Sequence, residues 1–383
     1  MSKRIVMLVL SLVVIASLVL AGCAPETAPP PEEEEEEAAP EEEEEEGPPP
    51  VQPEAEVHKW DCQSFMATGE PEWADFQAMF EKIELLSGGQ LDITVHPSGA
   101  LASGWKIPDC VPEGVCDLWH SGLYPLLGVF GPAAYLLASS GLPAGPTALE
   151  TTAWYYVGDG MELCNEAMAD YGYVIGLACD TAELFCHSNV KMETAKDLKG
   201  LKFRTYGLWA EIMKDYGASV ITLSGDEVYS AAERGVIDAF EFRPPAANWT
   251  KGFHEITKYL GVPGIHSPAN PHIFLVNKEK WDSLPEDLQT LLKDEISGWA
   301  LHRLMYGPYD DALAMKNYEE YGTELVTVSD ELQQDIATRT KEWCEKTAAE
   351  DALFKKVYEN QMAFVQAFRK QSQIVQPQYS MYD

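Results

Sequence analysis

The alternation of apolar and polar residues from position 57 onward predicts strands and helices in turn. His58 to Phe65 has the composition of a strand, and Leu91 to Val95 alternates as a second strand that Pro97 stops. Between these strands, four apolar residues recur at helical spacing: Trp73, Phe76, Phe80 and Ile83. A strand, a helix and a strand in this order indicate the start of an α/β domain.

A second region repeats this order. It predicts a helix over Leu208 to Tyr216, a strand over Ser219 to Leu223 and a helix over Asp226 to Arg234. Both regions end in Gly-Val-x-Asp, at Gly114 to Asp117 and again at Gly235 to Asp238. Two similar βαβαβ units predict two parallel-sheet lobes that face each other.

The last third of the chain is mainly helical by pattern. A strand is expected over Pro271 to Asn277, a helix over Pro285 to Tyr306 and a strand over Glu324 to Val328. Ser329, followed by two acidic residues, is a good N-cap for a long helical segment through Arg369. The apolar residues of this segment predict core packing or a contact between two copies of the chain.

Residues 1–22 have the pattern of a secretory signal. Lys3 and Arg4 precede an apolar run from Ile5 to Leu20 and then small residues. Leu20-Ala-Gly-Cys resembles the bacterial lipobox, so Cys23 is expected to be acylated and to anchor the chain to a membrane. An uncleaved spanning anchor is the alternative, because the run nearly reaches the roughly 17 residues that a spanning helix needs. Both predict an extracytoplasmic location, at the cell surface or in the periplasm.

Residues 23–56 contain two runs of six glutamates with prolines around them. A segment this polar cannot bury enough apolar surface to offset the conformational entropy lost on ordering. We therefore expect it to be an extended, disordered tether. Residues 1–56 hold 15 glutamates against Lys3 and Arg4, a net charge of -13, which leaves -22 of the chain's -35 for the remainder. This excess argues against a nucleic-acid partner. An anionic ligand must therefore be held by local geometry.

Seven cysteines follow Cys23, and this odd number leaves at least one thiol free or paired between chains. Cys110 and Cys116 are close enough in sequence to be bridged. No spacing is typical of a CxxC zinc or redox site. Buried free cysteines that pack as small apolar residues are the favoured interpretation.

The segment from Asp197 to Gly207 combines a basic approach, a short β run, one arginine and a turn that opens a helix. Ligands of α/β proteins bind at the carboxyl ends of strands, where Arg204 is expected to lie. Its planar guanidinium fits a carboxylate through two parallel hydrogen bonds. Spacing alone leaves open the alternative of an ordinary surface arginine.

Six motifs carry a family resemblance: Leu86 to Leu91, Asp197 to Arg204, Gly225 to Tyr229, Gly235 to Glu241, Lys251 to Tyr259, and Asn277 to Trp281. In this order and at these intervals they resemble the extracytoplasmic solute-binding proteins of TRAP transporters, the DctP-type family. The branch that binds 2-oxo acids and lactate is the most similar. The resemblance covers His58 to Phe368.

The resemblance implies an α/β, two-lobed periplasmic-binding-protein-like fold with a ligand cleft between the lobes and a long C-terminal helical segment. Lobe I is expected to comprise residues 57–181 with 270–309, and lobe II residues 182–269 with 310–369. Residues 370–383 are expected to form a C-terminal tail.

In such proteins an arginine at the position of Arg204 pairs with the ligand carboxylate. By the same resemblance Glu183 and Phe242 are ligand-binding candidates. Glu183, Glu241 and a backbone carbonyl of Phe242 are candidates to hold Na⁺ or Ca²⁺ beside the ligand, since these ions prefer oxygen ligands. Where relatives carry a carboxylate in a His-Glu-Pro turn, this chain reads His266-Ser-Pro, which removes one ligand. The alternative is that both glutamates pair with basic residues.

Trp119, His120 and Tyr124 follow the first Gly-Val-x-Asp motif, where relatives carry cleft residues, and are further ligand-binding candidates. Packing of Trp119 and Tyr124 in the core is the alternative. His187 and His272 have no metal-ligand spacing and are interpreted as structural.

The sequence therefore predicts a lipid-anchored, non-enzymatic binder of a small monocarboxylate, such as a 2-oxo or 2-hydroxy acid. It would deliver this acid to a TRAP permease, and the C-terminal helix would allow a homodimer. No cofactor is expected to be required, and Na⁺ or Ca²⁺ is a candidate to accompany the ligand. A ligand-sensing partner of a surface receptor is one alternative. A tethered hydrolase using Glu183 and Glu241 is another, although the chain has no Gly-x-Ser-x-Gly or HExxH motif.

Overall fold

The computed structural model describes residues 56–138 and 142–376, and residues 55–383 form one compact unit. The expected leader, the lipid-bearing Cys23, nearly all of the acidic tether and the end of the expected tail lie outside the described residues. In the described part, no helix is long and apolar enough to cross a membrane.

Two mixed sheets form the centre of this unit. The first contains β1 (His58–Ser64), β2 (Leu91–His96), β3 (Leu118–Ser121), β4 (Tyr173–Asp180) and β10 (Asn270–Val276), in the order β2-β1-β3-β10-β4. β1 is parallel to β2 and β3, whereas β10 is antiparallel to β3 and β4. The α/β class and the parallel pairing of β1, β2 and β3 are confirmed, but the sheet is mixed, because β10 returns from the second sheet and pairs antiparallel with β3 and β4.

The second sheet contains β5 (Cys186–Ser188), β6 (Lys202–Arg204), β7 (Ser219–Ile221), β8 (Ala239–Phe240), β9 (Tyr259–Val262) and β11 (Glu324–Thr327). Its order is β11-β9-β5-β8-β6-β7. β6 is parallel to β7 and β8, while β5 is antiparallel to β8 and β9. The group β7-β6-β8 thus repeats the arrangement β2-β1-β3.

The repeated Gly-Val-x-Asp motif has the same structure in both sheets. Gly114 and Gly235 have φ of 68° and 69°, a left-handed turn that favours glycine. Asp117 accepts a hydrogen bond from the backbone N–H of Asp61 at 2.9 Å, and Asp238 accepts one from the N–H of Lys202 at 3.0 Å. Each aspartate therefore joins the start of β3 or β8 to the strand beside it, which confirms the internal repeat.

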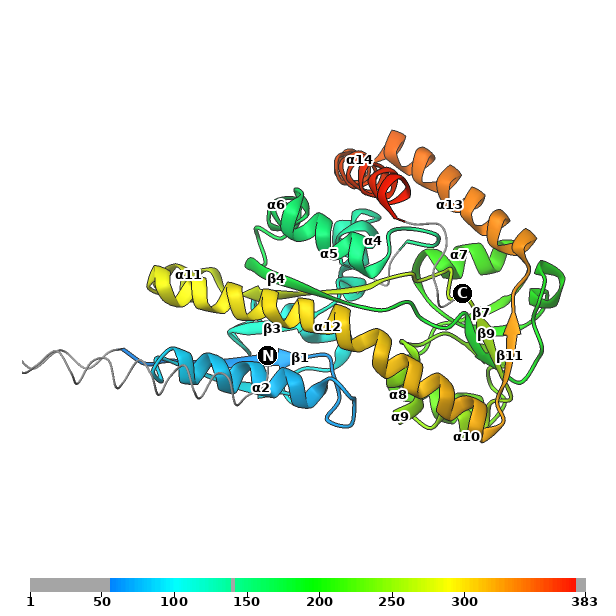
Figure 1. The fold of residues 1–383 in the computed structure, drawn as a ribbon, viewed down its shortest axis with the longest axis horizontal. Coiled ribbons are helices and arrows are strands. Elements are labelled where there is room, and N and C mark those ends of the chain that lie inside the picture. Colours follow the sequence, from blue (N-terminus) through cyan, green and yellow to red (C-terminus); the bar gives the residue numbers. More distant parts are fainter. Residues whose placement is uncertain (1–55, 139–141, 377–383) are drawn as a thin grey trace, which may run out of the picture. The chain divides into compact units, whose positions relative to one another are not determined.

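The helices cover these sheets (Figure 1). Their bounds are α2 (Trp73–Leu86), α3 (Leu127–Phe130), α4 (Ala133–Leu137), α5 (Ala148–Val157), α6 (Gly160–Ala167), α7 (Gly207–Asp215), α8 (Gly225–Glu233), α9 (Pro245–Thr250), α10 (Phe253–Ile256), α11 (Lys278–Ser283), α12 (Glu286–Tyr321), α13 (Asp330–Glu350) and α14 (Ala352–Val375), with short 3₁₀ turns η1 (Gly104–Asp109), η2 (Tyr124–Leu126) and η3 (Ala195–Leu198). The apolar face predicted for α2 is buried, with Phe76 and Ile83 fully inaccessible.

The helix expected to end at Tyr306 instead continues through Pro308 to Tyr321. Packing beyond the proline explains the difference. Tyr318 is fully buried, and Asp311 accepts a hydrogen bond from the backbone N–H of Ala246 at 2.9 Å. α12 therefore runs from beside α11 to α10 and contacts β4 of one sheet and α9 beside the other (Figure 1).

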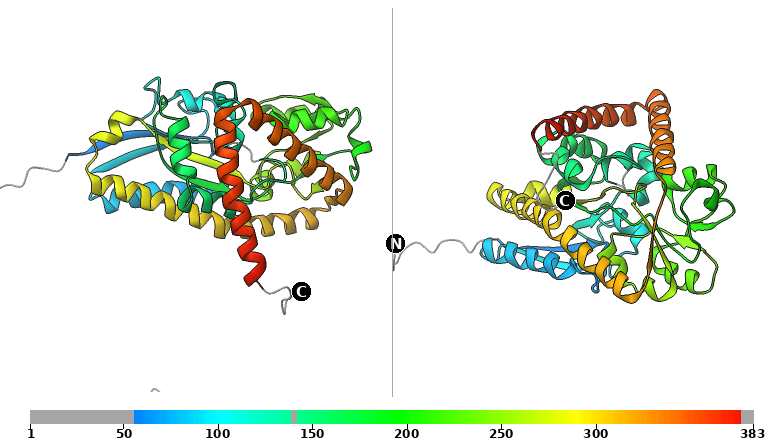
Figure 2. Two further views of the ribbon diagram at one scale, coloured as in Figure 1. Left: turned by 90° about the horizontal axis from the view of Figure 1, so that it is seen from above. Right: turned by 45° about the vertical axis from the view of Figure 1, so that its right-hand side comes forward.

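The long helical segment expected after Ser329 is two helices. Ser329 caps α13 as predicted, by accepting from the N–H of Leu332 at 3.2 Å. The segment breaks at Asp351, whose side chain accepts from the N–H of Phe354 and caps α14. α14 packs on α13, α4 and α5, and its last turns extend past the neighbouring elements (Figure 2).

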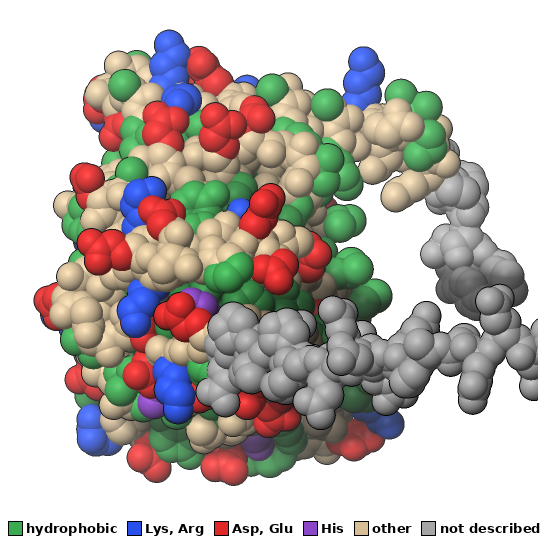
Figure 3. Space-filling view, turned by 90° about the vertical axis from the view of Figure 1, so that its left-hand side faces the viewer, with side chains coloured by type: hydrophobic (Ala, Val, Ile, Leu, Met, Phe, Trp, Pro, Cys, Tyr) green, Lys and Arg blue, Asp and Glu red, His purple; other side chains and the backbone are tan. Residues whose placement is uncertain are grey.

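The seven cysteines of the described residues are all free and buried. This confirms the interpretation of these thiols as small apolar side chains, and Cys110 and Cys116 form no disulfide. On the face shown in Figure 3, acidic, basic and apolar side chains are interspersed.

Gly176 on β4 allows α12 to approach the sheet. A Cβ at this position would lie 2.3 Å from Cγ2 of Ile296. We expect Gly176→Ala to lower the free energy of unfolding by about 1–3 kcal/mol through overpacking. Urea unfolding followed by circular dichroism measures this loss.

Gly298 on α12 is the matched control, because a Cβ at this position would meet no atom within 4 Å. Gly298→Ala should raise the free energy of unfolding by about 0.5–1 kcal/mol through helix propensity. Equal effects of the two substitutions would contradict this account of the contact between α12 and β4.

Candidate ligand-binding site

A cavity of about 360 Å³ lies where the two sheets meet. One side comes from the end of β4, the start of β10 and the residue after β1, and the other from the ends of β6 and β8. Strand ends are the usual position of ligands in α/β proteins. The lining includes Phe65, Glu70, Trp105, Tyr124, Asp180, Glu183, Arg204, Tyr206, Asp226, Phe242, Arg243, Lys251, Asn270 and His272.

Arg204 is the last residue of β6 and is only 4% exposed. Its Nε and Nη2 donate to the carbonyl oxygen of Leu223 at 3.2 and 3.0 Å. Its Nη1 donates to the carbonyl oxygen of Glu241 at 3.1 Å and to the Glu241 carboxylate at 3.2 Å. The protein thus fixes the guanidinium through the strands on either side, and Glu241 supplies the opposite charge that a buried cation needs.

Two segments that connect the first sheet with the second lie side by side near Arg204. Glu183 belongs to the segment between β4 and β5, and His266 to the segment between β9 and β10. The backbone N–H of Glu183 donates to the carbonyl oxygen of Ser267 at 3.0 Å. Gly264 permits this approach, since a Cβ there would lie 1.7 Å from the carbonyl oxygen of Glu183.

Glu183, Glu241 and His266 form a buried cluster, in which one potential ligand atom from each residue lies within 4.8 Å of the others. Nε2 of His266 is 3.0 Å from the Glu183 carboxylate. A water-sized pocket of about 20 Å³ adjoins the three residues. Two carboxylates suit a hard cation, whereas an imidazole nitrogen does not belong to the usual ligand set of Na⁺ or Ca²⁺.

Burial dominates the electrostatics of this cluster. It raises the pKa of Glu183 to about 8, although Arg204 and Arg243 oppose the shift. It also raises the pKa of Glu241, against the attraction of Arg204. Burial lowers the pKa of His266 to about 4, so the imidazole is neutral at pH 7. The cluster therefore favours a proton or a cation that neutralises its carboxylates.

A second polar group crosses the first sheet from strand to strand. Ser64 on β1 contacts Nδ1 of His120 on β3 at 3.1 Å, and Nε2 of His120 contacts Nδ1 of His272 on β10 at 2.5 Å. His272 then lies 3.5 Å from the carboxylate of Asp180 at the end of β4. Burial and His272 hold the pKa of His120 well below its usual value, so His120 is neutral.

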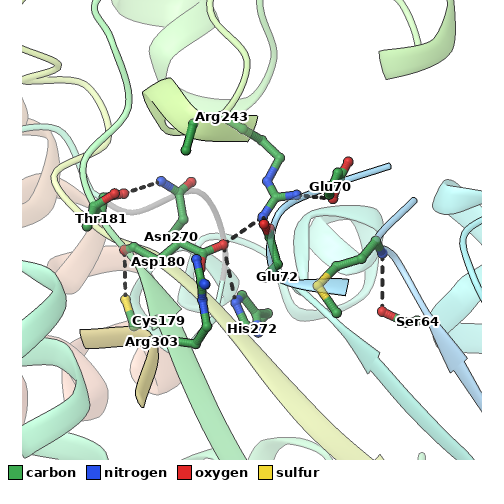
Figure 4. A network of polar contacts seen from close by, with 12 residues as sticks. Ser64, Glu70, Glu72, Cys179, Asp180, Thr181, Arg243, Asn270, His272 and Arg303 are labelled. Carbon is green, nitrogen blue, oxygen red and sulfur yellow. Dashed lines mark hydrogen bonds and ion pairs between the residues drawn. The ribbon is translucent and has the colours of Figure 1, made fainter. Parts of the chain in front are cut away.

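Arg243 joins this group to the second sheet. It follows β8 and donates to the carboxylates of Glu70, Glu72 and Asp180, with distances of 2.5 Å to Glu72 and 2.7 Å to Asp180 (Figure 4). Burial raises the pKa of Asp180, but Arg303, His272 and Arg243 outweigh this effect and hold it well below the usual range. One arginine that follows a strand of the second sheet thus binds Asp180 of the first sheet and two buried glutamates of the loop between β1 and α2.

The structure brings together most of the predicted site residues. Arg204, Glu183, Phe242 and Tyr124 line the cavity, and Glu241 lies in the adjoining pocket with Glu183. Trp119 and His120 are fully buried within β3 and are not among the lining residues. The packing alternative holds for Trp119, and His120 instead contacts Ser64 and His272.

Sequence reasoning missed several residues of the site: Phe65, Trp105, Tyr206, Arg243, His266 and His272. Some signals were available. Tyr206 stands two residues after Arg204, Phe65 directly follows β1, and Arg243 stands three residues after the end of β8. His266 belongs to the turn that departs from the family pattern. No spacing signal distinguishes Trp105 from a surface tryptophan.

Comparison with known proteins finds that residues 63–351 match the family described as bacterial extracellular solute-binding protein, family 7. A similar protein is a monocarboxylate 2-oxoacid-binding periplasmic protein of Nostoc sp. The two are 29% identical over 303 residues, which is 75% of this chain and 79% of the relative.

Solved structures share the fold. A TRAP periplasmic solute-binding protein from Pseudoalteromonas atlantica, with bound sodium and pyruvate, gives a TM-score of 0.76 at 26% identity, covering 84% of this chain and 97% of that one. Another from Colwellia psychrerythraea, with bound calcium and pyruvate, gives 0.76 at 24% identity, covering 84% and 98%. These matches confirm the predicted two-lobed solute-binding fold, while the lobe boundaries stay a prediction.

Replacing Arg243 tests the network between the sheets. We expect Arg243→Met to lower the free energy of unfolding by about 3–5 kcal/mol, because it leaves buried carboxylates without their partner. Chemical unfolding measures the loss. The exposed Arg234 is the matched control, and Arg234→Met should change stability by less than about 0.5 kcal/mol. A loss below about 1 kcal/mol in Arg243→Met would contradict the network's role.

The raised pKa of Glu183 predicts a pH-dependent stability. Its pKa is about 8 in the folded chain against a usual 4.5, so its favourable contribution is complete below pH 4.5 and is lost as the pH rises toward 8. Glu183→Gln removes this dependence. In buffer free of Na⁺ and Ca²⁺, the variant should gain about 2–4 kcal/mol relative to the unaltered protein between pH 5 and pH 8.5. If the difference in unfolding free energy between Glu183→Gln and the unaltered protein is the same at both pH values, the raised pKa of Glu183 is contradicted. Glu81→Gln, at an exposed position, is the control for the substitution itself.

Proposed function

Because this chain belongs to family 7 of the bacterial extracellular solute-binding proteins, we propose that it captures a small organic monocarboxylate, such as a 2-oxo or 2-hydroxy acid, for a TRAP-type transporter. The family consists of transport proteins rather than enzymes. Arg204 carries the proposal, as a buried guanidinium that lines a ligand-sized cavity. The activity of the 2-oxoacid-binding relative supports this ligand class.

Arg204 receives the carboxylate of the acid in this proposal. Its Nε and Nη2 are held by a backbone carbonyl, which leaves the fork oriented before a ligand arrives. Such pre-orientation reduces the entropy cost of binding. An incoming carboxylate competes with Glu241 for the guanidinium and is repelled by Glu183 and Glu241 whenever these are ionised.

A cation resolves this competition. Glu183, Glu241 and the backbone carbonyl of Phe242 would hold Na⁺ or Ca²⁺, and the bound ion would supply positive charge beside the acid. Buried carboxylates with raised pKa values fit this role, because a cation stabilises their ionised forms. Pyruvate accompanies sodium in the Pseudoalteromonas atlantica protein, which supports the pairing of ion and acid. His266 then contacts Glu183 and orients it rather than binding the ion.

The two sheets are proposed as the centres of the two lobes, with residues 57–181 and 270–309 in one and residues 182–269 and 310–369 in the other. All strands of the first sheet fall in the former ranges and all strands of the second in the latter. Closure of the lobes would exclude water from the acid. Phe242 and Tyr124, which line the cavity, would cover its apolar part.

Membrane attachment through a lipid on Cys23, transfer to a TRAP permease, and a homodimer through the C-terminal helix complete the proposal. The projecting end of α14 supports the dimer, since Ile374 and Val375 are 69% and 62% exposed there.

Replacing Arg204 tests the proposal directly. Titration calorimetry of the full chain with pyruvate, in the presence of Na⁺ and Ca²⁺, should show Arg204→Met binding at least about 100-fold more weakly, because a buried carboxylate loses its partner. Arg234→Met is the control and should bind normally. Affinity within threefold of the unaltered protein in Arg204→Met would refute the proposed role.

A further inference from the structure

Three aromatic rings form a continuous group in the wall of the cavity. Trp105 lies 5.2 Å from Tyr124 and 6.1 Å from Tyr206 between ring centroids, and Tyr124 lies 5.9 Å from Tyr206. Trp105 belongs to η1 and Tyr124 to η2, whereas Tyr206 follows β6. The group therefore joins elements that accompany the two different sheets, and all three residues line the cavity.

This aromatic group lies directly beside the proposed carboxylate position. The guanidinium carbon of Arg204 is 5.5 Å from the ring centroid of Tyr206. A ligand held by Arg204 thus has the three rings within reach of its carbon chain. Trp105 is 41% exposed, which leaves a large apolar side chain uncovered at the site. Such a surface is typical of ligand pockets, which are lined mainly by apolar and aromatic side chains.

The cavity is larger than a three-carbon acid requires for its own volume. Its 360 Å³ falls within the range of about 300–1,000 Å³ found for pockets that bury drug-sized ligands. Phe65 and Phe242 add two more rings to the lining. A molecule as small as pyruvate would leave most of this apolar surface without contact.

The charges of the lining restrict the rest of the ligand. Arg243 already binds three carboxylates, and Lys251 lies 3.2 Å from Glu70. Glu70, Asp180 and Asp226 also line the cavity. Arg243 and Lys251 are therefore already paired with carboxylates of the protein. A second carboxylate on the ligand, placed away from Arg204, would meet net repulsion from the acidic lining residues.

From these observations we propose that the site selects a monocarboxylic acid with an aromatic or branched apolar tail, which packs against Trp105, Tyr124 and Tyr206. This inference rests on the proposed function, because it takes Arg204 as the carboxylate anchor. It adds the chemical class of the tail and excludes a second acidic group.

Calorimetry with the full chain purified in detergent tests the inference, using pyruvate, 4-methyl-2-oxopentanoate, phenylpyruvate and 2-oxoglutarate in the presence of Na⁺ and Ca²⁺. Phenylpyruvate and 4-methyl-2-oxopentanoate should bind at least about tenfold more tightly than pyruvate, since each added apolar group in a fitting pocket contributes about tenfold or more. 2-Oxoglutarate should bind more weakly than phenylpyruvate.

Trp105→Ala should weaken the binding of phenylpyruvate more than that of pyruvate, and so reduce the preference for phenylpyruvate over pyruvate by about tenfold. Trp105→Phe, which keeps a ring at this position, should retain most of the preference. The partial exposure of Trp105 makes a folding defect a minor concern, and the melting temperature of each variant checks it.

The outcomes separate this inference from the function on which it rests. If pyruvate binds as tightly as phenylpyruvate, the inference is overturned and the proposed function stays intact. The same holds if 2-oxoglutarate binds more tightly than phenylpyruvate. A preference unchanged in Trp105→Ala would overturn the role of the aromatic group. No binding of any acid would overturn the proposed function itself.

Discussion

The contact between Arg204 and Glu241 is the interaction on which the site depends. A guanidinium that is 4% exposed needs an opposite charge within reach, and in the structure a protein carboxylate supplies it. Backbone carbonyls of Leu223 and Glu241 hold the same guanidinium, so strand geometry determines its position. In the proposed function, anion capture at this point exchanges the Glu241 carboxylate for that of the ligand. A proton or cation that neutralises Glu241 and its neighbour Glu183 would favour this exchange.

The two arginines of the cavity have different surroundings and different roles. Arg243 is bound by Asp180 at the end of β4 and by Glu70 and Glu72, which holds the segment after β8 against the first sheet and the loop before α2. Arg204 has a single carboxylate partner. The first arginine thus joins the two sheets, and the second is the one whose partner a ligand would replace in the proposed function. Two residues of the same type in one cavity are distinguished by how many charges surround each.

Periodicity and turn chemistry predicted most elements of the fold. The bounds of β1, α2, β2, α7 and α8 agree with the sequence patterns to within a few residues, and the two Gly-Val-x-Asp motifs occupy equivalent positions. The extension of α12 beyond Pro308 was missed, because the burial of Tyr318 against distant elements outweighs the local effect of a proline. The antiparallel position of β10 was missed for a related reason, since it depends on chain topology rather than on local pattern.

The site was predictable only in part. Strand-end logic and the family resemblance indicated Arg204, Glu183 and Glu241. The family resemblance also indicated Trp119, but this side chain is fully buried in a hydrophobic core cluster, and the packing that places it there is formed by residues distant in the sequence. Arg243 and His266 were missed because their partners lie far away in the sequence.

The most direct test of the central claim is a crystal structure of the protein with a bound 2-oxo acid. The account predicts the acid's carboxylate within hydrogen-bond distance of the Arg204 guanidinium, in the cavity between the sheets. An acid bound elsewhere, with Arg204 still paired only to Glu241, would contradict it.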